Sequence, residues 1–352
     1  MPTPELLQRL LLATGPSGHE SAPATVWREG CSQFTQDVKG DVMGSSRARV
    51  PGSAGGPRLA IVGHIDEIGL HVSHIDDDGY LHFGQLGGWD PLVLVGQRVR
   101  LITRSGAVPG VIGRKPIHLL RDDDRKKAPE LKDLHIDVGA KDGEDARAVV
   151  QIGDVAVIEA DPLELPNGRL VARALDNRIG CYIAAEAARL VAAAGGAPGE
   201  VVAMAVVQEE TTFGGSRTSA FSLAPDVAVV VDLTHATDQP GIELGPTTKH
   251  TLDSGPVVAR GTAIHPRVSE LLHDTAEQEG ISFTLESLGR ATGTDADAIH
   301  LSREGIATGL VSIPCRYMHS PVEMVSLADV DAGARLIAAF AQRLTPGMSF
   351  ER

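Results

Sequence analysis

The segment "EVVAMAVVQEETTFGG", residues 200–215, joins an apolar run to two adjacent glutamates, Glu209 and Glu210. An unbroken run of Val, Ala and Met is typical of a strand that is covered on both faces of a sheet. Neighbouring side chains at the end of a strand point in different directions, so we expect the two carboxylates to have different roles. The segment predicts a buried sheet with an acidic strand end.

Three other segments have the same apolar character: "RLAIVGHIDEIG" (58–69), "DVAVVVDLTHA" (226–236) and "TGLVSIPCRYMHS" (308–320). Between and after them, residues 178–194, 266–280 and 328–344 show the apolar periodicity of helices that cover a sheet. This alternation predicts an α/β fold, with a mixed, largely parallel sheet and helices on both faces.

The middle of the chain, residues 69–163, has a different residue pattern. Its segments are short, partly alternating and punctuated by Gly and Pro, as in "LHVSHIDDDGYLHFGQL" (70–86), where "HIDDDG" predicts a hairpin turn. Such a pattern is typical of a small β-barrel or sandwich. We therefore predict an α/β domain built from residues 1–68 and 164–352, with a β domain, residues 69–163, inserted into it.

Composition narrows the class of protein. The 352 residues are 42% apolar and 22% charged, as in ordinary globular proteins, and the net charge of -14 argues against a nucleic-acid surface. Three cysteines without a CxxC motif favour a reducing compartment. No apolar run reaches membrane-spanning length, so the sequence favours a cytoplasmic protein without a membrane partner.

Polar residues stand where each apolar strand stops, and a further carboxylate, Asp176, precedes a helix. At the strand ends are His64, Asp66, Glu209, Glu210, Asp232 and His319. A single Asp or His at a strand end is more often a turn or cap residue than a ligand. Together they suggest one site, because ligands of open α/β sheets bind beyond the carboxyl ends of the strands. Imidazoles and carboxylates without a thiolate suit catalytic zinc, cobalt or manganese, and Asp66 is placed to accept the free N–H of His64.

Several motifs carry a family resemblance. "GHIDEIGL" (63–70), "RALDNRIGC" (173–181), "VVQEETTFGG" (206–215), "VVVDLTHA" (229–236) and "IPCRYMHSPVEM" (313–324) occur in this order. Together they resemble the dinuclear-metal aminopeptidases that assemble as tetrahedral dodecamers, the glutamyl and deblocking aminopeptidase group. "GRKPIH" (113–118), "LHIDVGA" (134–140) and "GTDADAIHLS" (293–302) extend the resemblance over nearly the whole chain.

The resemblance implies two divalent metal ions per subunit, zinc first, with cobalt or manganese as alternatives. His64 and Asp232 would hold one metal and Glu210 and His319 the other, with Asp176 bridging. Glu209 would be the general base for a metal-bridging hydroxide that removes N-terminal residues from peptides, and Asp66 would orient His64. The expected partners are short peptides and other copies of the chain, which would form dimers through the inserted domain and then a dodecamer.

One motif departs from the family pattern. After its glutamate pair the chain reads "TTFGGS" (211–216), which leaves the preferred N-terminal residue open between acidic, aliphatic and basic. An acidic preference would require a cation, for which Lys249, Arg260 and Arg316 are candidates. The native metal and the role of the Arg121–Lys127 loop also stay open.

Other functions compete with this interpretation. A related metal-dependent deacylase or carboxypeptidase would share the ligands, but its inserted domain usually follows the glutamate pair. A glycosidase could use paired carboxylates but needs neither His64 nor His319, and 3% aromatic residues offer few sugar-stacking platforms. A non-catalytic assembly protein would be expected to lack ligand residues, and every expected position is filled.

Overall fold

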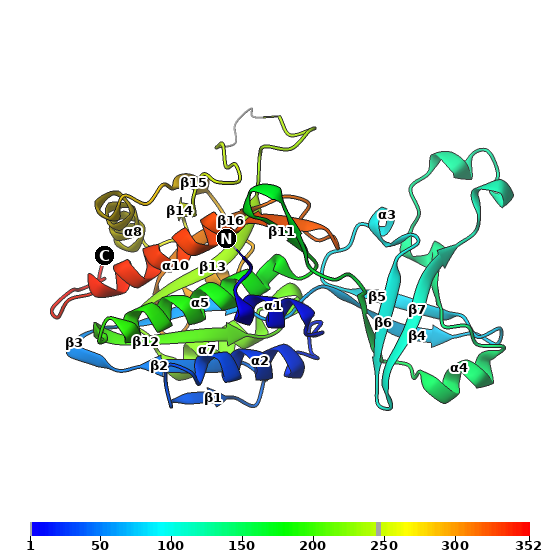
Figure 1. Ribbon diagram of the computed structural model, residues 1–352, viewed down its shortest axis with the longest axis horizontal. Coiled ribbons are helices and arrows are strands. Elements are labelled where there is room, and N and C mark those ends of the chain that lie inside the picture. Colours follow the sequence, from blue (N-terminus) through cyan, green and yellow to red (C-terminus); the bar gives the residue numbers. More distant parts are fainter. Residues whose placement is uncertain (1, 244–247) are drawn as a thin grey trace.

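The computed structural model describes residues 2–243 and 248–352. Figure 1 shows two bodies side by side along the longest axis. The larger one contains both ends of the chain and is built from a sheet with helices around it. The smaller one is a β-barrel formed by the middle of the chain.

The main sheet has eight strands within the described residues. Their order is β1 (Val38–Gly40), β2 (Ser46–Val50), β12 (Ala197–Val206), β3 (Gly52–His64), β13 (Val227–His235), β16 (Ala307–Cys315), β14 (Val257–Gly261) and β15 (Thr284–Leu288). The central strands β12, β3, β13 and β16 are parallel, whereas β1, β2 and β14 form antiparallel pairs. The predicted mixed, largely parallel sheet is confirmed.

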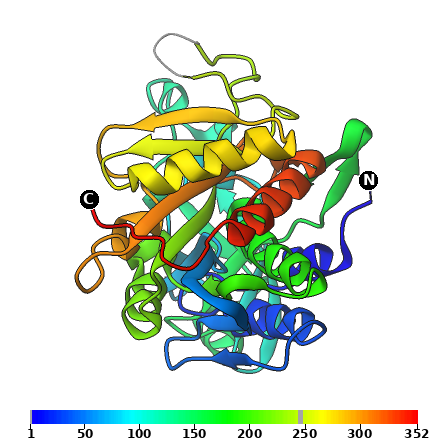
Figure 2. The same ribbon diagram turned by 90° about the vertical axis from the view of Figure 1, so that its left-hand side faces the viewer.

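Both faces of this sheet are covered, because alternate residues of each central strand enter different cores. In β3, Leu59 and Ile61 belong to the larger core, while Ala60 and Val62 belong to the smaller one. The first face is covered by α1 (Glu5–Leu12), α2 (Ser21–Cys31), α5 (Leu175–Ala193), α8 (Pro266–Glu279) and α10 (Leu327–Gln342), and the second by α7 (Gly214–Leu223) and α9 (Ala296–Ile299). Figure 2 shows α10 lying between α5 and α8 on the first face.

The barrel is closed and antiparallel. Its strands, in order around the barrel, are β4 (Gly69–Ile75), β5 (Leu81–Leu86), β8 (Leu134–Asp137), β7 (Gly106–Arg114), β6 (Arg98–Thr103) and β9 (Val155–Ile158). It has its own core, which includes Leu70, Val99 and Ile136. The predicted small barrel is confirmed, and so is the hairpin turn, which joins β4 to β5. Shorter helices accompany it: α3 (Pro91–Leu94), α4 (Gly143–Val149), and 3-10 turns at Ile117–Leu119, Asp124–Lys126 and Leu131–Asp133.

A small antiparallel sheet was not predicted from the sequence. It consists of β10 (Leu163–Leu165), β11 (Arg169–Ala172) and β17 (Glu323–Ser326), with a 3-10 turn at Pro166–Gly168. These strands are too short to give a periodic signal. Their register pairs Ala172 with Glu323, which brings the segment before α5 beside the segment after β16. This pairing places Glu323 within hydrogen-bond distance of the backbone N–H groups of Asp176 and His319.

No helix in the described part of the chain is both long and apolar enough to cross a membrane.

Strand β3 packs unusually closely against α5 at Gly63. A Cβ atom at this position would lie 2.3 Å from the carbonyl carbon of Gly180 and 2.5 Å from the amide nitrogen of Cys181. Both atoms belong to the helix backbone, so neither can move aside without shifting α5. The absence of a side chain at Gly63 therefore sets the distance between the strand that ends in His64 and the helix that begins beside Asp176.

We expect Gly63→Ala to destabilise the protein by about 2 kcal/mol or more, because overpacking against a fixed backbone typically costs 1–3 kcal/mol. Thermal and denaturant unfolding of the metal-free protein measure the loss. Gly289→Ala is the matched control, since a Cβ there meets no atom within 4 Å. Equal unfolding midpoints for Gly63→Ala and the wild type would contradict the packing argument.

Candidate metal centre

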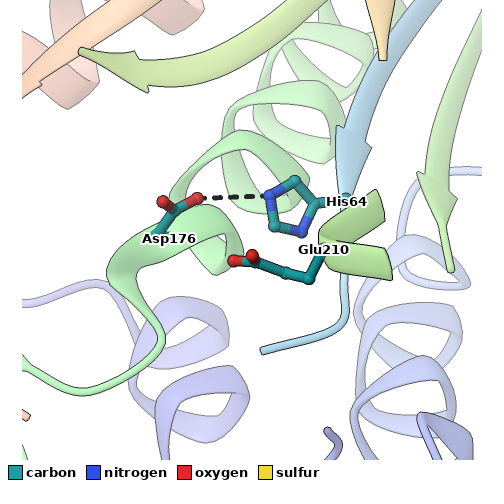
Figure 3. Close-up of side chains that lie close together, drawn as sticks. All are labelled: His64, Asp176 and Glu210. Carbon is teal, nitrogen blue, oxygen red and sulfur yellow. Dashed lines mark hydrogen bonds and ion pairs between the residues drawn. The ribbon is translucent and has the colours of Figure 1, made fainter. Parts of the chain in front are cut away.

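The strand-end residues converge on one cavity of about 310 Å3. His64 ends β3, Asp232 lies near the end of β13, and His319 follows β16. Glu209 and Glu210 begin α6 (Glu209–Thr212), directly after β12, and Asp176 lies in the first turn of α5. All six of these residues line the cavity, and Asp66 lies behind it, fully buried. Figure 3 shows His64, Asp176 and Glu210 gathered from three different elements.

Asp176 lies between the two imidazoles. Its Oδ1 is 3.2 Å from Nε2 of His64, and its Oδ2 is 3.6 Å from Nε2 of His319. Nε2 of His319 is also 3.4 Å from Oε1 of Glu210. One carboxylate thus directs one oxygen toward each histidine, which is the arrangement that a bridging ligand requires.

Two overlapping groups of side chains have their ligand atoms within 4.8 Å of one another. One group is His64, Asp176 and Glu210; the other is His64, Glu209 and Asp232. All the donors are imidazole nitrogens and carboxylate oxygens, the set that suits zinc, cobalt and manganese. The chemistry of the donors therefore fits a divalent cation, and their number fits more than one.

The electrostatics of the cavity also favour a cation. Burial raises the pKa of Glu209 to about 10, and the charges of Asp232, Asp295 and Glu210 add to the rise against the opposing effect of His64. The pKa values of Glu210 and Asp232 are raised as well, first by burial and then by Asp176. So many carboxylates in a buried site cannot all ionise unless positive charge balances them.

Both histidines present Nε2 to the cavity because their Nδ1 atoms are engaged elsewhere. Nδ1 of His319 lies 2.8 Å from the carbonyl oxygen of Gly88. Nδ1 of His64 lies 3.2 Å from the carbonyl oxygen of Asp66 and 3.4 Å from its Oδ1. A carbonyl oxygen can only accept, so it selects the tautomer with the proton on Nδ1 and leaves the lone pair on Nε2 free for a metal.

Gly88 belongs to the barrel segment after β5, so the smaller body reaches into the site. A Cβ at the neighbouring Gly87 would lie 3.0 Å from Oε2 of Glu210, and one at Gly88 would lie 3.3 Å from Nδ1 of His319. Only residues without a side chain allow the backbone to approach both groups without displacing them. No local pattern signals this contact, because Gly88 and His319 lie more than 200 positions apart in the chain.

Asp66 does more than face His64. Its Oδ1 accepts the backbone N–H of Glu209 at 3.1 Å and its Oδ2 accepts that of Glu210 at 3.2 Å. The Ser17 hydroxyl also donates to it. Burial would raise the pKa of Asp66, but these donors and His64 hold it below its usual value. One buried carboxylate thus fixes the start of α6, from which the glutamate pair projects.

Sequence reasoning missed a second carboxylate of this kind, Glu323. Its Oε2 accepts the backbone N–H of Asp176 at 3.1 Å, and its Oε1 accepts that of His319 at 2.9 Å. The side chain is 2% exposed. Glu323 stands four residues after His319 in the "MHSPVEM" motif, but a single glutamate in a turn cannot be distinguished from a surface residue by sequence alone. A third buried carboxylate, Asp295, was also missed; burial raises its pKa to about 6.

The "TTFGGS" segment leads away from the cavity. Thr211 and Thr212 complete α6, and Gly214 begins α7. The N–H of Gly215 donates to the carbonyl of Val207, and a Cβ there would lie 2.4 Å from the Val207 nitrogen. The residues described as lining the cavity include none from 211–216. The unusual segment is therefore a tight helix junction, and its sequence does not bear directly on the shape of the cavity.

Sequence comparison gives the family. The signature of the M42 glutamyl aminopeptidase family matches residues 44–336. The chain is 34% identical over 345 residues to a lysyl aminopeptidase of Pyrococcus furiosus, covering 97% of each protein.

Structural comparison agrees. A TET aminopeptidase from a marine sediment archaeon of the Thaumarchaeota superimposes with a TM-score of 0.92 at 36% identity, over 97% of this chain and 96% of that one. The TET1 peptidase of Pyrococcus horikoshii, whose structure is described as assembling into a tetrahedron or a large octahedral shell, gives a TM-score of 0.85 at 30% identity, over 97% and 99% of the two chains. With its fold, its sequence and the order of its motifs in agreement, this chain belongs to the M42 glutamyl aminopeptidase family.

Proposed function

We propose that this chain is a dinuclear metal-dependent aminopeptidase that removes N-terminal residues from short peptides. The observation that carries the proposal is the position of Asp176, with one carboxylate oxygen toward His64 and the other toward His319. Residues 1–68 and 164–352 would form the catalytic domain.

The cavity offers ligands for two cations. His64 and Asp232 would hold one, Glu210 and His319 the other, and Asp176 would bridge them; zinc is the first choice, with cobalt and manganese as alternatives. When bound, such a pair lowers the pKa of a coordinated water toward neutrality and stabilises the negative charge that develops on the scissile carbonyl oxygen. The raised pKa values of Glu210 and Asp232 support this assignment, since positive charge would let both carboxylates ionise.

Glu209 would be the general base. Its carboxylate faces the cavity, with Oε2 3.7 Å from Nε2 of His64. Its neighbour Glu210 contacts His319, so the two glutamates face different histidines, as adjacent residues with separate roles should. With positive charge in the cavity its pKa would fall from its raised value toward the working range. Glu209 would then take a proton from the attacking water and pass it to the leaving amine.

Asp66 and Glu323 would act as positioning residues. Each uses both carboxylate oxygens to hold the backbone N–H groups of two residues that face the cavity. Charge-assisted hydrogen bonds to backbone amides are short and directional, so they fix these residues before a cation arrives. Without them, the start of α6 and the segments around Asp176 and His319 would have to be ordered by the cation itself.

We further propose that the barrel, residues 69–163, mediates self-association into dimers and then a tetrahedral dodecamer. The shell-forming peptidase of Pyrococcus horikoshii supports this proposal. So do the large apolar side chains that the inserted segment exposes, namely Leu92, Val111, Ile117, Leu119, Val149 and Ile152. Large apolar side chains that one copy leaves exposed are candidates for burial between copies.

The names of the relatives do not fix the preferred first residue. The family is described by glutamyl activity and one close relative by lysyl activity. Glutamyl and lysyl side chains carry opposite charges. The preferred first residue of this chain therefore depends on the residues that line its own cavity.

Chelation should abolish hydrolysis of aminoacyl amides, and zinc, cobalt or manganese should restore it, because the proposed chemistry needs the cations. A panel of aminoacyl p-nitroanilides measures the effect, with an N-acetylated substrate as control. Cleavage of the acetylated substrate would identify a deacylase or endopeptidase instead. Activity that survives metal removal would contradict the proposal.

Glu209→Gln should retain metal but lose turnover by about 10²- to 10⁴-fold, the usual contribution of a general base. Glu210→Ala should lose metal, because it removes a ligand. Metal content by elemental analysis, measured beside kcat, separates the two. The same metal content in both variants would contradict the division of roles.

Glu323→Gln should weaken metal binding by about 10- to 100-fold, because the amide nitrogen that replaces one oxygen can no longer accept an N–H group. Competition with a chromophoric chelator measures the affinity, and Glu323→Asp should recover part of it. Glu304→Gln, at the opposite end of the strands, is a control for loss of one negative charge. Unchanged affinity in Glu323→Gln would show that the backbone contacts do not position the ligands.

A further inference from the structure

One side of the catalytic cavity is not accounted for by the metal site. Beyond the proposed ligands, the cavity is lined by an apolar group and a polar group. The apolar side chains are Leu233, Leu288, Leu310 and Met318, and the polar ones include Thr234 and Glu286. A substrate bound at the cations would place its first side chain against this lining.

Glu286 is the carboxylate of this region. It lies in β15, and because side chains alternate along a strand it shares a face with Leu288, two residues further on. Its Oε1 accepts a hydrogen bond from the Thr234 hydroxyl at 3.2 Å. Thr234 in turn shares a face of β13 with Asp232. Thr234 therefore holds the Glu286 carboxylate at the cavity. Along β13, Thr234 lies two residues from Asp232, a proposed metal ligand.

The described residues that line the cavity include no lysine and no arginine. The three candidates for an acidic preference are placed elsewhere. Arg316 forms two hydrogen bonds with Asp238, at 2.9 and 2.7 Å, and Lys249 and Arg260 are exposed and do not line the cavity. Burial lowers the pKa of His250, the imidazole near Glu286, which disfavours its charged form. Within the described residues, the Glu286 carboxylate thus has a hydroxyl partner and no lysine or arginine partner.

Two divalent cations would balance the carboxylates that hold them, whereas Glu286 is not among the proposed ligands and lines the cavity together with apolar side chains. That combination matches a long aliphatic stem with a positive end. An acidic side chain would meet an unpaired carboxylate instead, which disfavours it.

We propose that the cavity selects peptides whose first residue is lysine or arginine, with the aliphatic stem against the leucines and Met318 and the cationic end at Glu286. This inference rests on the proposed aminopeptidase function and names its substrate class. Glu286 would be the specificity-determining residue.

The kinetic test compares lysyl, norleucyl and glutamyl p-nitroanilides on the zinc-loaded enzyme. Norleucine is lysine without its terminal amine, so the pair isolates the charge. We expect kcat/KM to fall from lysyl to norleucyl to glutamyl, with about a 10- to 100-fold difference between the first two, the value of a hydrogen bond to a charged group. Glu286→Gln should remove that difference while leaving norleucyl hydrolysis within about twofold.

The control is Glu304→Gln, which removes one negative charge in the separate cavity beside Ala307, where β16 begins. It should leave the lysyl preference unchanged. A wild-type enzyme that cleaves lysyl and norleucyl substrates equally would overturn the inference. So would an equal loss on all three substrates in Glu286→Gln, since that result would place the free α-amine, common to them all, at Glu286.

Binding separates this inference from the proposed function. Calorimetry of the zinc-loaded protein with free L-lysine and L-norleucine requires no hydrolysis. Tighter binding of L-lysine that Glu286→Gln abolishes would support the pocket assignment even if no amide were cleaved, in which case only the proposed reaction would fail. Equal binding of the two amino acids would overturn the pocket assignment.

Discussion

The crowding of carboxylates at one end of a buried sheet is the constraint on which the rest of the structure depends. Asp176, Glu209, Glu210 and Asp232 share one cavity with two imidazoles. Burial and the neighbouring negative charges raise the pKa values of Glu209, Glu210 and Asp232. Burial would raise the pKa of Asp176 as well, but His64 and His319 hold it below its usual value. Such an arrangement persists in a folded protein only where backbone donors hold it in place and positive charge is available to balance it. The first condition is visible in the elements around the cavity, and the proposed cations would meet the second.

Hydrogen bonds from backbone amides hold the cavity residues in place. Asp66 and Glu323 each accept two backbone N–H groups, one on each carboxylate oxygen. The donors belong to residues that face the cavity, so these two buried carboxylates orient the acids and the imidazole that are available for ligation. The close packing of β3 on α5 at Gly63 acts in the same direction, since it fixes the distance between the elements that carry His64 and Asp176.

The barrel contributes a backbone contact to the candidate site. The carbonyl of Gly88 engages Nδ1 of His319 and thereby leaves Nε2 toward Asp176 and Glu210. A barrel that moved relative to the sheet would release this contact. If the barrel also forms the interface between copies, as we propose, association and the orientation of one metal ligand would share the same short segment.

Sequence by itself determined the layered fold, the small barrel and the set of strand-end residues, because each depends on local signals: apolar runs, turn residues and the polar residue at which a strand stops. It pointed to Asp66 only as a partner of His64 and gave no sign of Glu323, Gly88 or Glu286. Those three depend on contacts between distant segments: the pairing of Ala172 with Glu323, the approach of the barrel to His319, and the reach of β15 toward Thr234. Only the tertiary structure decided them, because a residue's partners across a sheet or between two bodies follow from strand order and register, which no local pattern encodes.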